Sequence, residues 1–402
     1  MRYCIACRRQ LPAKPVFKLE NAPASAQDIP DETEVKADAG MELLLYQCAH
    51  CGLVQFDCPP VSYYRDVIRA GGFSETMTNL RRDQYRHLIE TYHLEGKRFL
   101  EVGCGGGEFL GVLAGFPVKA YGMEHRQVLV DKARAAGLQV WREFPEAADQ
   151  VFGKSEAGLE GPFDVFLSFN FLEHQPEPDI MLRAIYGNLS EGGMGLITVP
   201  ALEYILEQGC YYELLRDHIA YYSFDTLRRL LERNGFAVLE EEMVNRDTIS
   251  MVVKKLREGE WITPAASVQE ALPDSLAEGY EITRGEIENL ARDLERKGKR
   301  LAIWGASHQG FTLAATTVLG QAAEYMIDSA PFKQGRFAPA SHLPIVAPEH
   351  FSRHPVDVVL IVAPGYTDEI AGIIRSRFGR EVRILAVRTK HIEIMQEGAG
   401  WS

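Results

Sequence analysis

The chain has 402 residues, of which 46% are hydrophobic and 25% charged, a composition typical of a globular protein with two or three domains. The net charge of −13 argues against a nucleic-acid partner, because proteins that bind nucleic acids are more often basic. No apolar run is long enough to cross a bilayer, and the first residues lack the apolar core of a signal peptide. We therefore expect a cytoplasmic protein without a membrane partner.

Four of the seven cysteines form two closely spaced pairs, Cys4 with Cys7 and Cys48 with Cys51. In a reducing compartment this pattern favours metal binding over disulfides, and four thiolates complete the tetrahedral shell of a structural Zn²⁺ ion. The alternatives are unmetallated thiols, a redox pair, or a substitute ligand such as His50 or Cys58. Residues 1–65 are thus predicted to be a zinc-binding module, with an extended loop at 22–40 and a strand at 43–48.

Residues 66–255 alternate between apolar runs and amphipathic stretches. After a helix near 76–92, strands are expected at 98–102, 118–123, 163–169, 194–199 and 248–254, with helices at 126–136, 178–189 and 223–234. Such alternation predicts an α/β fold, in which helices cover both faces of a mainly parallel sheet. Ser223 is a favourable N-cap for the last of these helices, and Gly235 suits its end.

The segment 99–110 joins a buried strand to a helix through a glycine cluster that lacks the Gly-Lys-Ser/Thr of a phosphate-binding loop. It resembles the S-adenosylmethionine (SAM) loop of class I methyltransferases. The alternative is a dinucleotide-binding fold, from which the glycine spacing departs. Acids stand at the ends of the first two strands, where they suit the ammonium group and the ribose hydroxyls of the cofactor. The expected cofactor-binding residues are Glu101, Gly103, Cys104, Gly105, Gly107, Glu124 and Asn170.

Two histidines follow predicted strands on the side where open α/β sheets bind their ligands. His174 suits a general base, a donor to a substrate carbonyl, or a structural cap. His218 directly follows Asp217. The predicted catalytic residues are His218, His174 and Asp217. Adjacent residues do not share a helical face, so Asp217 is not expected to orient His218 directly. Tyr212, shortly before them, is a candidate substrate contact.

The last part of the chain repeats the α/β pattern without repeating the sequence. Residues 256–280 are expected to form a linker that includes a helix, and 281–402 a second α/β domain with strands at 300–305, 324–328 and 356–363 and a helix at 312–319. Gly305 and His308 open a strand-to-helix turn, where backbone N–H groups suit a phosphate. Lys333 and Arg336 suit a diphosphate. The alternative is a charged loop that packs domains together.

Taken together, these features resemble the sugar C-methyltransferases, which act on nucleotide-linked keto-deoxysugars. The resemblance rests on the four cysteines, the SAM loop, Asp217-His218 before Tyr221-Tyr222-Ser223, and the stretch 328–336. It implies a zinc-binding module, a class I SAM methyltransferase domain with a Rossmann-like fold, and a Rossmann-like C-terminal domain that binds the nucleotide of a nucleotide-diphosphate sugar. The family needs one chain per active site, so we expect a monomer.

The resemblance also implies a mechanism. A base removes the C3 proton beside a C4 ketone, and the enolate takes a methyl group from SAM, which requires no metal and yields a branched-chain deoxysugar. A base with a pKa near neutrality suits histidine. His218 matches the family's base and His174 its second histidine, while the substrate contacts fall to Tyr212, Gly305, His308, Lys333 and Arg336. The alternatives are O-methylation, a non-sugar acceptor, or a non-catalytic scaffold that binds SAM or a nucleotide sugar.

The chain departs from the family at two tyrosines. The family commonly has Tyr-x-Glu-His where this chain has Leu215-Arg216-Asp217-His218, and Arg69 lies near the place of the second tyrosine. Six side chains are candidates to replace the tyrosines or to stabilise the enolate: Tyr63, Tyr64, Tyr211, Tyr212, Arg69 and Arg216.

Overall fold

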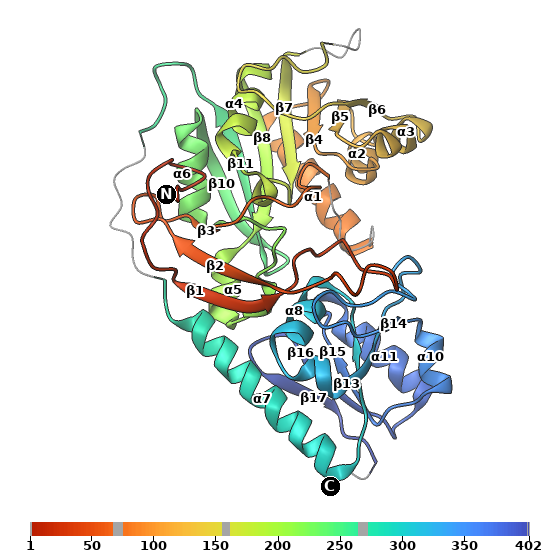
Figure 1. Ribbon diagram of the computed structural model, residues 1–402. Coiled ribbons are helices and arrows are strands. Elements are labelled where there is room, and N and C mark those ends of the chain that lie inside the picture. The colour runs from red at the N-terminus through yellow and green to blue at the C-terminus, as the bar shows by residue number, and fades with distance from the viewer. Residues whose placement is uncertain (1, 67–74, 155–160, 264–271, 400, 402) are drawn as a thin grey trace.

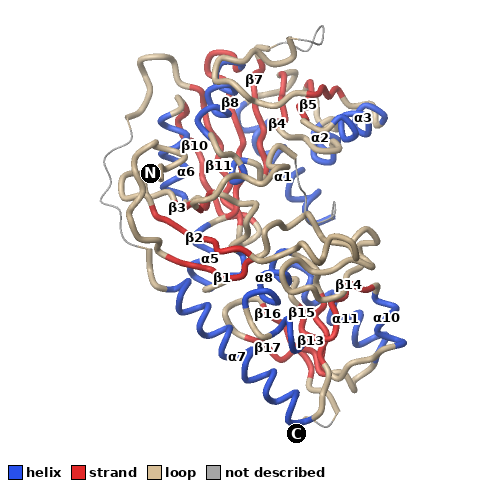
Figure 2. The backbone as a smooth tube through the Cα atoms, viewed as in Figure 1, coloured by secondary structure: helices blue, strands red, loops and turns tan. Residues whose placement is uncertain are grey.

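The computed structural model describes residues 2–66, 75–154, 161–263, 272–399 and 401. Its strands form three sheets, and the four-stranded sheet near the N-terminus lies between a seven-stranded and a six-stranded sheet (Figure 1). Helices cover the two larger sheets, whose strands are confined to separate parts of the molecule (Figure 2). The predicted α/β fold is confirmed.

The seven-stranded sheet has the order β10-β11-β8-β7-β4-β5-β6. Its strands are β4 (Arg98–Val102), β5 (Lys119–Glu124), β6 (Gln139–Arg142), β7 (Phe163–Phe169), β8 (Leu189–Pro200), β10 (Phe236–Val244) and β11 (Thr248–Lys255). The first five of these run parallel, and β11 pairs antiparallel with both β8 and β10. The strand order reverses between β4 and β7, and open α/β sheets bind ligands at the carboxyl ends beside such a reversal.

The segments between these strands are mostly helical, and they agree with the predicted helices to within a few residues. The helices are α1 (Glu75–Tyr92), α2 (Glu108–Leu113), α3 (Gln127–Ala135), α4 (Pro178–Asn188), α5 (Leu202–Gln208) and α6 (Phe224–Arg233), with short 3₁₀ helices η1 (Leu172–His174) and η2 (Tyr211–Glu213). The helix η1 follows β7, whereas η2 follows β8 and the short helix α5, so both lie beyond the carboxyl ends of these strands.

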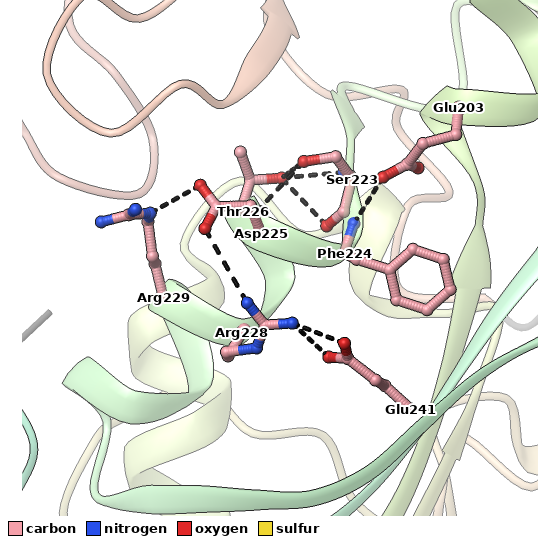
Figure 3. Close-up of polar contacts among 8 residues, drawn as sticks. All are labelled: Glu203, Ser223, Phe224, Asp225, Thr226, Arg228, Arg229 and Glu241. Atoms are coloured by element: carbon pink, nitrogen blue, oxygen red, sulfur yellow. Dashed lines mark hydrogen bonds and ion pairs between the residues drawn. The ribbon is translucent and has the colours of Figure 1, made fainter. Parts of the chain in front are cut away.

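Helix α6 begins directly after Ser223, as the sequence predicts. The Ser223 hydroxyl accepts the backbone N–H of Thr226 at 3.2 Å, and the Thr226 hydroxyl accepts the N–H of Ser223 at 2.8 Å (Figure 3). The Glu203 carboxylate accepts the N–H of Phe224 at 2.8 Å. These contacts satisfy donors that have no partner within the helix, so they fix where α6 begins.

Replacing Ser223 by Ala is expected to lower the free energy of unfolding by about 1 kcal/mol, because the N–H of Thr226 loses its acceptor. The measurement is the midpoint of urea unfolding. Arg228→Ala is the matched control on the same helix, since it removes an exposed ion pair with Glu241 that contributes less. Equal stability of the Ser223 variant and the parent would contradict the assigned cap.

The four-stranded sheet joins the N-terminal module to the central domain. It has the order β1-β2-β3-β9, formed by β1 (Phe17–Ala22), β2 (Met41–Gln47), β3 (Val54–Phe56) and β9 (Ala220–Tyr221). Strand β9 lies two residues after His218 and pairs with β3, with Val54 opposite Tyr221. The predicted boundary at residue 65 therefore separates strands that share one sheet.

The six-stranded sheet has the order β14-β13-β12-β15-β16-β17 and is parallel except for β17. Its strands are β12 (Leu301–Trp304), β13 (Ala323–Ile327), β14 (Ile345–Val346), β15 (Val358–Ile361), β16 (Arg383–Val387) and β17 (Ile392–Gln396). The helices are α7 (Ser275–Lys297), α8 (His308–Thr316), α9 (Leu319–Ala322), α10 (Pro348–Arg353) and α11 (Thr367–Phe378), with η3 at Pro364–Tyr366. Helix α7 begins inside the predicted linker, of which residues 264–271 lie outside the described residues. Helix α8 begins four residues earlier than predicted, since Ser307 caps it.

One of the buried apolar clusters has members in all three parts. Phe17 and Leu45 of the small sheet, Tyr211 of η2 and Leu301 of β12 belong to the same buried cluster. Packing of this kind holds the domains in one arrangement and closes the region where they meet. None of the described helices combines the length and the apolar character that a bilayer-spanning helix requires.

Candidate active site

The glycine loop after β4 brings the backbone to the carboxyl edge of the large sheet. Gly103, Gly105 and Gly107 have φ angles of 74°, 58° and 83°, a region that side chains other than glycine seldom adopt. A Cβ atom on Gly107 would lie 2.4 Å from Leu138 Cδ1, so a larger residue would collide with the interior. The loop therefore presents backbone rather than side chains to a ligand.

Two buried acids flank this loop, as the sequence predicts. Glu101 is in β4, two residues before the first glycine, and Glu124 ends β5. One carboxylate oxygen of Glu124 accepts the N–H of Gly105 at 3.0 Å and the other accepts the N–H of Arg126 at 2.9 Å. Burial raises the pKa of Glu124. Because each oxygen has a second lone pair, the carboxylate retains the capacity to accept two hydroxyl groups.

The other two predicted cofactor residues differ in what they present. Cys104 is fully buried in the core with Leu110 and Val140, so only its backbone is available at the loop. Asn170 follows β7 with a φ of 49°, and its side-chain oxygen accepts the hydroxyl of Thr198 at 3.0 Å. This contact fixes the orientation of the Asn170 amide at the sheet edge.

The two predicted histidines lie against each other. Their ring centroids are 4.7 Å apart, and the planes meet at 80°. The Nδ1 of His174 is 2.9 Å from the backbone carbonyl of Asp217. A carbonyl only accepts, so Nδ1 carries the hydrogen and Nε2 of His174 keeps its lone pair. The loop of His218 therefore determines the tautomer of His174.

Both imidazoles are neutral near pH 7. Burial lowers the pKa of His174, and it lowers the pKa of His218 further, with the neighbouring His174 and His308 acting in the same direction. His218 nevertheless keeps 18% of its side chain exposed, whereas His174 is buried. Of the two rings, His218 is the one with access to a bound molecule.

Asp217 does not orient either imidazole through its carboxylate. The two oxygens accept the backbone N–H of Ala26 at 3.0 Å and the hydroxyl of Tyr63 at 2.9 Å. Both partners come from the N-terminal module. The carboxylate therefore ties the histidine loop to that module, and the catalytic role of Asp217 stays a prediction.

Among the predicted replacements for the family's tyrosines, Tyr63 donates its hydroxyl to Asp217, the residue before His218. Arg216 instead donates to the carbonyl of Pro59, and Arg69 lies outside the described residues.

Glu173 is the residue of this site that the sequence analysis passed over. It directly precedes His174 in η1, is 1% exposed, and has Oε1 3.9 Å from Nε2 of His218. Burial raises its pKa to about 8. Glu173, His174 and His218 each present a polar atom within 4.8 Å of the others. In the sequence, the only sign that Glu173 belongs to this site is its position next to His174.

The segment 23–40 between β1 and β2, here called the bridging segment, spans the gap between the two α/β domains. Besides the contact of Ala26 with Asp217, it accepts Arg336 Nη1 on the carbonyl of Ile29 at 2.7 Å and the N–H of Phe337 on Pro30 at 2.9 Å. In Figure 1 it follows β1 and passes between the two larger units. A cavity of about 560 Å³ lies between this segment and the loop after β13, lined in part by Asp28, Glu34, Asp38, Phe332 and Arg336.

The predicted substrate contacts of the C-terminal domain divide into two groups. His308, at the start of α8, faces the central domain, where Nε2 lies 3.2 Å from a carboxylate oxygen of Glu213. Lys333 donates to the carbonyl of Ala306 at 2.8 Å and to Asp328 at 3.1 Å, which places it beside the turn that begins at Gly305. The turn, His308 and Lys333 thus lie near one another, while Arg336 lines the cavity at the bridging segment.

Tyr212 has a different environment from the predicted one. Its side chain is fully buried, and its hydroxyl donates to the carbonyl of Thr389 at 2.9 Å. The ring packs between the central and C-terminal domains, and its hydroxyl group joins the two. The substrate contact of Tyr212 therefore stays a prediction.

The four paired cysteines converge as predicted. Cys4 Sγ lies 3.5 Å from Cys51 Sγ, and Cys7 Sγ lies 3.5 Å from Cys48 Sγ. All four sulfur atoms lie within 4.8 Å of one another and could hold a metal ion, and none forms a disulfide. The cluster belongs to the module that carries the bridging segment.

Two family models match the chain. A methyltransferase domain covers residues 77–241, and a C-methyltransferase C-terminal domain covers residues 238–384. Among curated relatives, the C-methyltransferase NovU of Streptomyces niveus is 25% identical over 297 residues, which are 69% of this chain and 68% of that protein. The ubiquinone biosynthesis O-methyltransferase of Caulobacter sp. (strain K31) is 33% identical over 108 residues, 26% of this chain and 41% of that protein.

Two solved structures that the chain resembles each align with less than half of it. A SAM-dependent methyltransferase from Clostridium acetobutylicum has a TM-score of 0.36 at 13% identity and covers 45% of this chain and 92% of its own. Magnesium protoporphyrin IX methyltransferase (ChlM) from Synechocystis PCC 6803, with bound SAH, has a TM-score of 0.34 at 17% identity and covers 44% and 83%.

Proposed function

We propose that this chain, which belongs to the sugar C-methyltransferase family and is a SAM-dependent C-methyltransferase, methylates C3 of a nucleotide-linked 4-keto-deoxysugar. The similarity to C-methyltransferase NovU extends over 69% of the chain and supports methylation at carbon. The product of this reaction is a branched-chain deoxysugar.

The observation that carries the proposal is the neutral pair His174 and His218 where the two α/β domains meet. A carbon atom becomes a nucleophile only after a base removes a proton beside the ketone, and a neutral imidazole is suited to do so. His218 is the base, because its ring is partly exposed. His174, buried beside it with Nε2 unprotonated, supports the ring of His218.

The glycine loop and its acids suit SAM, which supplies an electrophilic methyl group when bound. The residues that would hold it are Glu101, Gly103, Gly105, Gly107, Glu124 and Asn170, with the backbone of Cys104. Gly305, His308 and Lys333 would contact the diphosphate or sugar, and Arg336 would contact the nucleotide from the side of the cavity at the bridging segment.

The cysteine cluster suits a structural zinc ion. Four thiolates at about 2.3 Å from a tetrahedral Zn²⁺ stand about 3.8 Å apart, close to the 3.5 Å of the two measured pairs. With four protein ligands, the ion has no open position for a substrate. We propose that the ion stabilises the fold of the N-terminal module. The protein is proposed to be cytoplasmic and to act as a single chain.

The test is incubation of the purified protein with SAM and a panel of nucleotide-linked 4-keto-6-deoxyhexoses, followed by mass spectrometry of the sugar. The expected result is a product heavier by one CH₂ unit, with the new methyl group on C3 by NMR. Tight SAM binding without methylation of any panel member would contradict the proposed substrate.

Hydrogen exchange separates methylation at carbon from methylation at oxygen. With S-adenosylhomocysteine in place of SAM, incubation in D₂O is expected to introduce deuterium at C3, because the base acts before the methyl group is transferred. An O-methyltransferase has no need to remove that proton, so product formation without exchange at C3 would favour the alternative.

A further inference from the structure

The carboxyl group of Glu173 is buried without a hydrogen-bond partner among the residues that the structure describes. Neither oxygen is bonded, and the residue is 1% exposed. A buried polar group in this condition is costly and calls for a reason. The backbone around it is well fixed, since the carbonyl of Glu173 accepts the N–H of Ile219 at 3.0 Å.

The ring of His218 is the nearby group that this carboxyl can serve. Oε1 of Glu173 lies 3.9 Å from Nε2 of His218, and neither ring nitrogen of His218 is hydrogen-bonded to another described residue. Catalytic hydrogen bonds are often long before substrate binds and shorten in the complex. Because Nε2 faces Glu173, Nδ1 is the nitrogen left for a substrate.

We propose that Glu173 is a positioning residue for His218: its carboxylate accepts the Nε2–H of the imidazole and thereby leaves the lone pair on Nδ1. This deepens the proposed function, on which it rests for the identity of the substrate. The proton of the substrate carbon passes to Nδ1, and its electron pair stays on the substrate as the enolate. The positive charge that forms on the ring is then paired with the carboxylate.

The other ionisable groups around the pair do not supply this carboxylate. His174 is neutral and bonded to a carbonyl, and the Asp217 carboxylate is occupied by Ala26 and Tyr63. Of the remaining groups that face the pair, Tyr221 and Tyr222 are uncharged near pH 7, and His308 is cationic when protonated.

The pairing makes the base sensitive to pH in a defined direction. Burial raises the pKa of Glu173 to about 8 and lowers the pKa of His218, so below pH 8 the proton resides on the carboxyl group. The carboxyl O–H then donates to Nε2, and Nδ1 carries the ring hydrogen and cannot act as a base. Above pH 8 the carboxylate accepts Nε2–H and Nδ1 is free. The proton-removing form therefore increases as the pH rises through about 8.

Histidine NMR tests the pairing without any sugar substrate. In the full chain with ¹³C,¹⁵N-labelled histidine, the His218 signals, assigned by their loss in His218→Asn, are followed from pH 6 to 9.5. We expect a change of ring tautomer near pH 8 that disappears in Glu173→Gln and persists in Glu177→Gln. Glu177 is the matched control, because it lies on the same segment and is half exposed.

Glu173→Asp is the conservative variant, and it should keep the tautomer change with a shifted midpoint. Persistence of the change in Glu173→Gln, or its absence from the parent protein, would overturn the proposal. Failure to methylate any nucleotide sugar would leave the NMR result standing, so it would count against the substrate and not against the pairing.

Once a substrate is in hand, Glu173→Gln should lower kcat about tenfold or more at pH 8.5, with the KM for SAM unchanged. It should also abolish the rise of kcat through pH 8. An unchanged pH profile with reduced kcat would mean that Glu173 is merely structural.

Discussion

Replacing His218 by Asn is expected to lower kcat for methyl transfer by about 10²- to 10⁴-fold, because an amide cannot take up the substrate proton. The affinity for SAM should stay within about twofold, since the expected cofactor residues lie near the ends of β4 and β5 and on the loops after β4 and β7, and not on the loop of His218. The measurements are the initial rate with a saturating keto sugar and calorimetric titration with SAM.

Asn is close to His in size, so His218→Asn is expected to fold like the parent protein. A loss of activity can then be distinguished from a loss of folding. His391→Asn is the matched control, because His391 is an exposed histidine of the C-terminal domain that pairs with Glu286. Deuterium exchange at C3 with S-adenosylhomocysteine should also disappear in His218→Asn. Retention of activity to within about threefold would assign the base to another residue.

Replacing Cys48 by Ser is expected to abolish stoichiometric zinc binding, which we expect at one ion per chain in the parent protein. Structural zinc sites contribute on the order of 10 kcal/mol to the folding of small metal-bound modules. The N-terminal module should therefore lose its fold, and activity should fall with it, because Ala26 and Tyr63 hold the residue next to His218.

The measurements are metal content by plasma mass spectrometry and protection of β2 amides from hydrogen exchange. Cys58→Ser is the control, since Cys58 lies outside the four-sulfur cluster. Zinc retained at one ion per chain in Cys48→Ser, or a parent protein that contains no zinc, would refute the assignment.

What the sequence predicts well is local in character. The spacing of apolar residues predicts β4 and β7 to the residue, and the cap at Ser223 predicts the start of α6, because each signal lies within a few residues of the feature it specifies. The convergence of the four cysteines was predictable for a related reason, since two short pairs each present both sulfur atoms to one point.

What the sequence predicts poorly depends on packing between distant segments. Strand β9 has only two residues, and it exists because β3 lies beside it. The sequence predicts Tyr212 as a site residue, because it does not show that the Tyr212 hydroxyl donates to the carbonyl of Thr389 in the C-terminal domain. The placement of Glu173 behind His218 requires that two loops after different strands meet, and no local pattern encodes that meeting.

The pairing of β3 with β9 also has a consequence for how the protein is made. The last strand of the N-terminal sheet is synthesised more than 160 residues after β3, so a nascent chain cannot complete that sheet until most of the central domain has left the ribosome. Until then β3 lacks its neighbour β9, although the four cysteines of the N-terminal module have already been synthesised. A fragment that stops short of Ala220 would therefore emerge with an open sheet edge, prone to aggregate, and expression of the N-terminal module alone should give insoluble material.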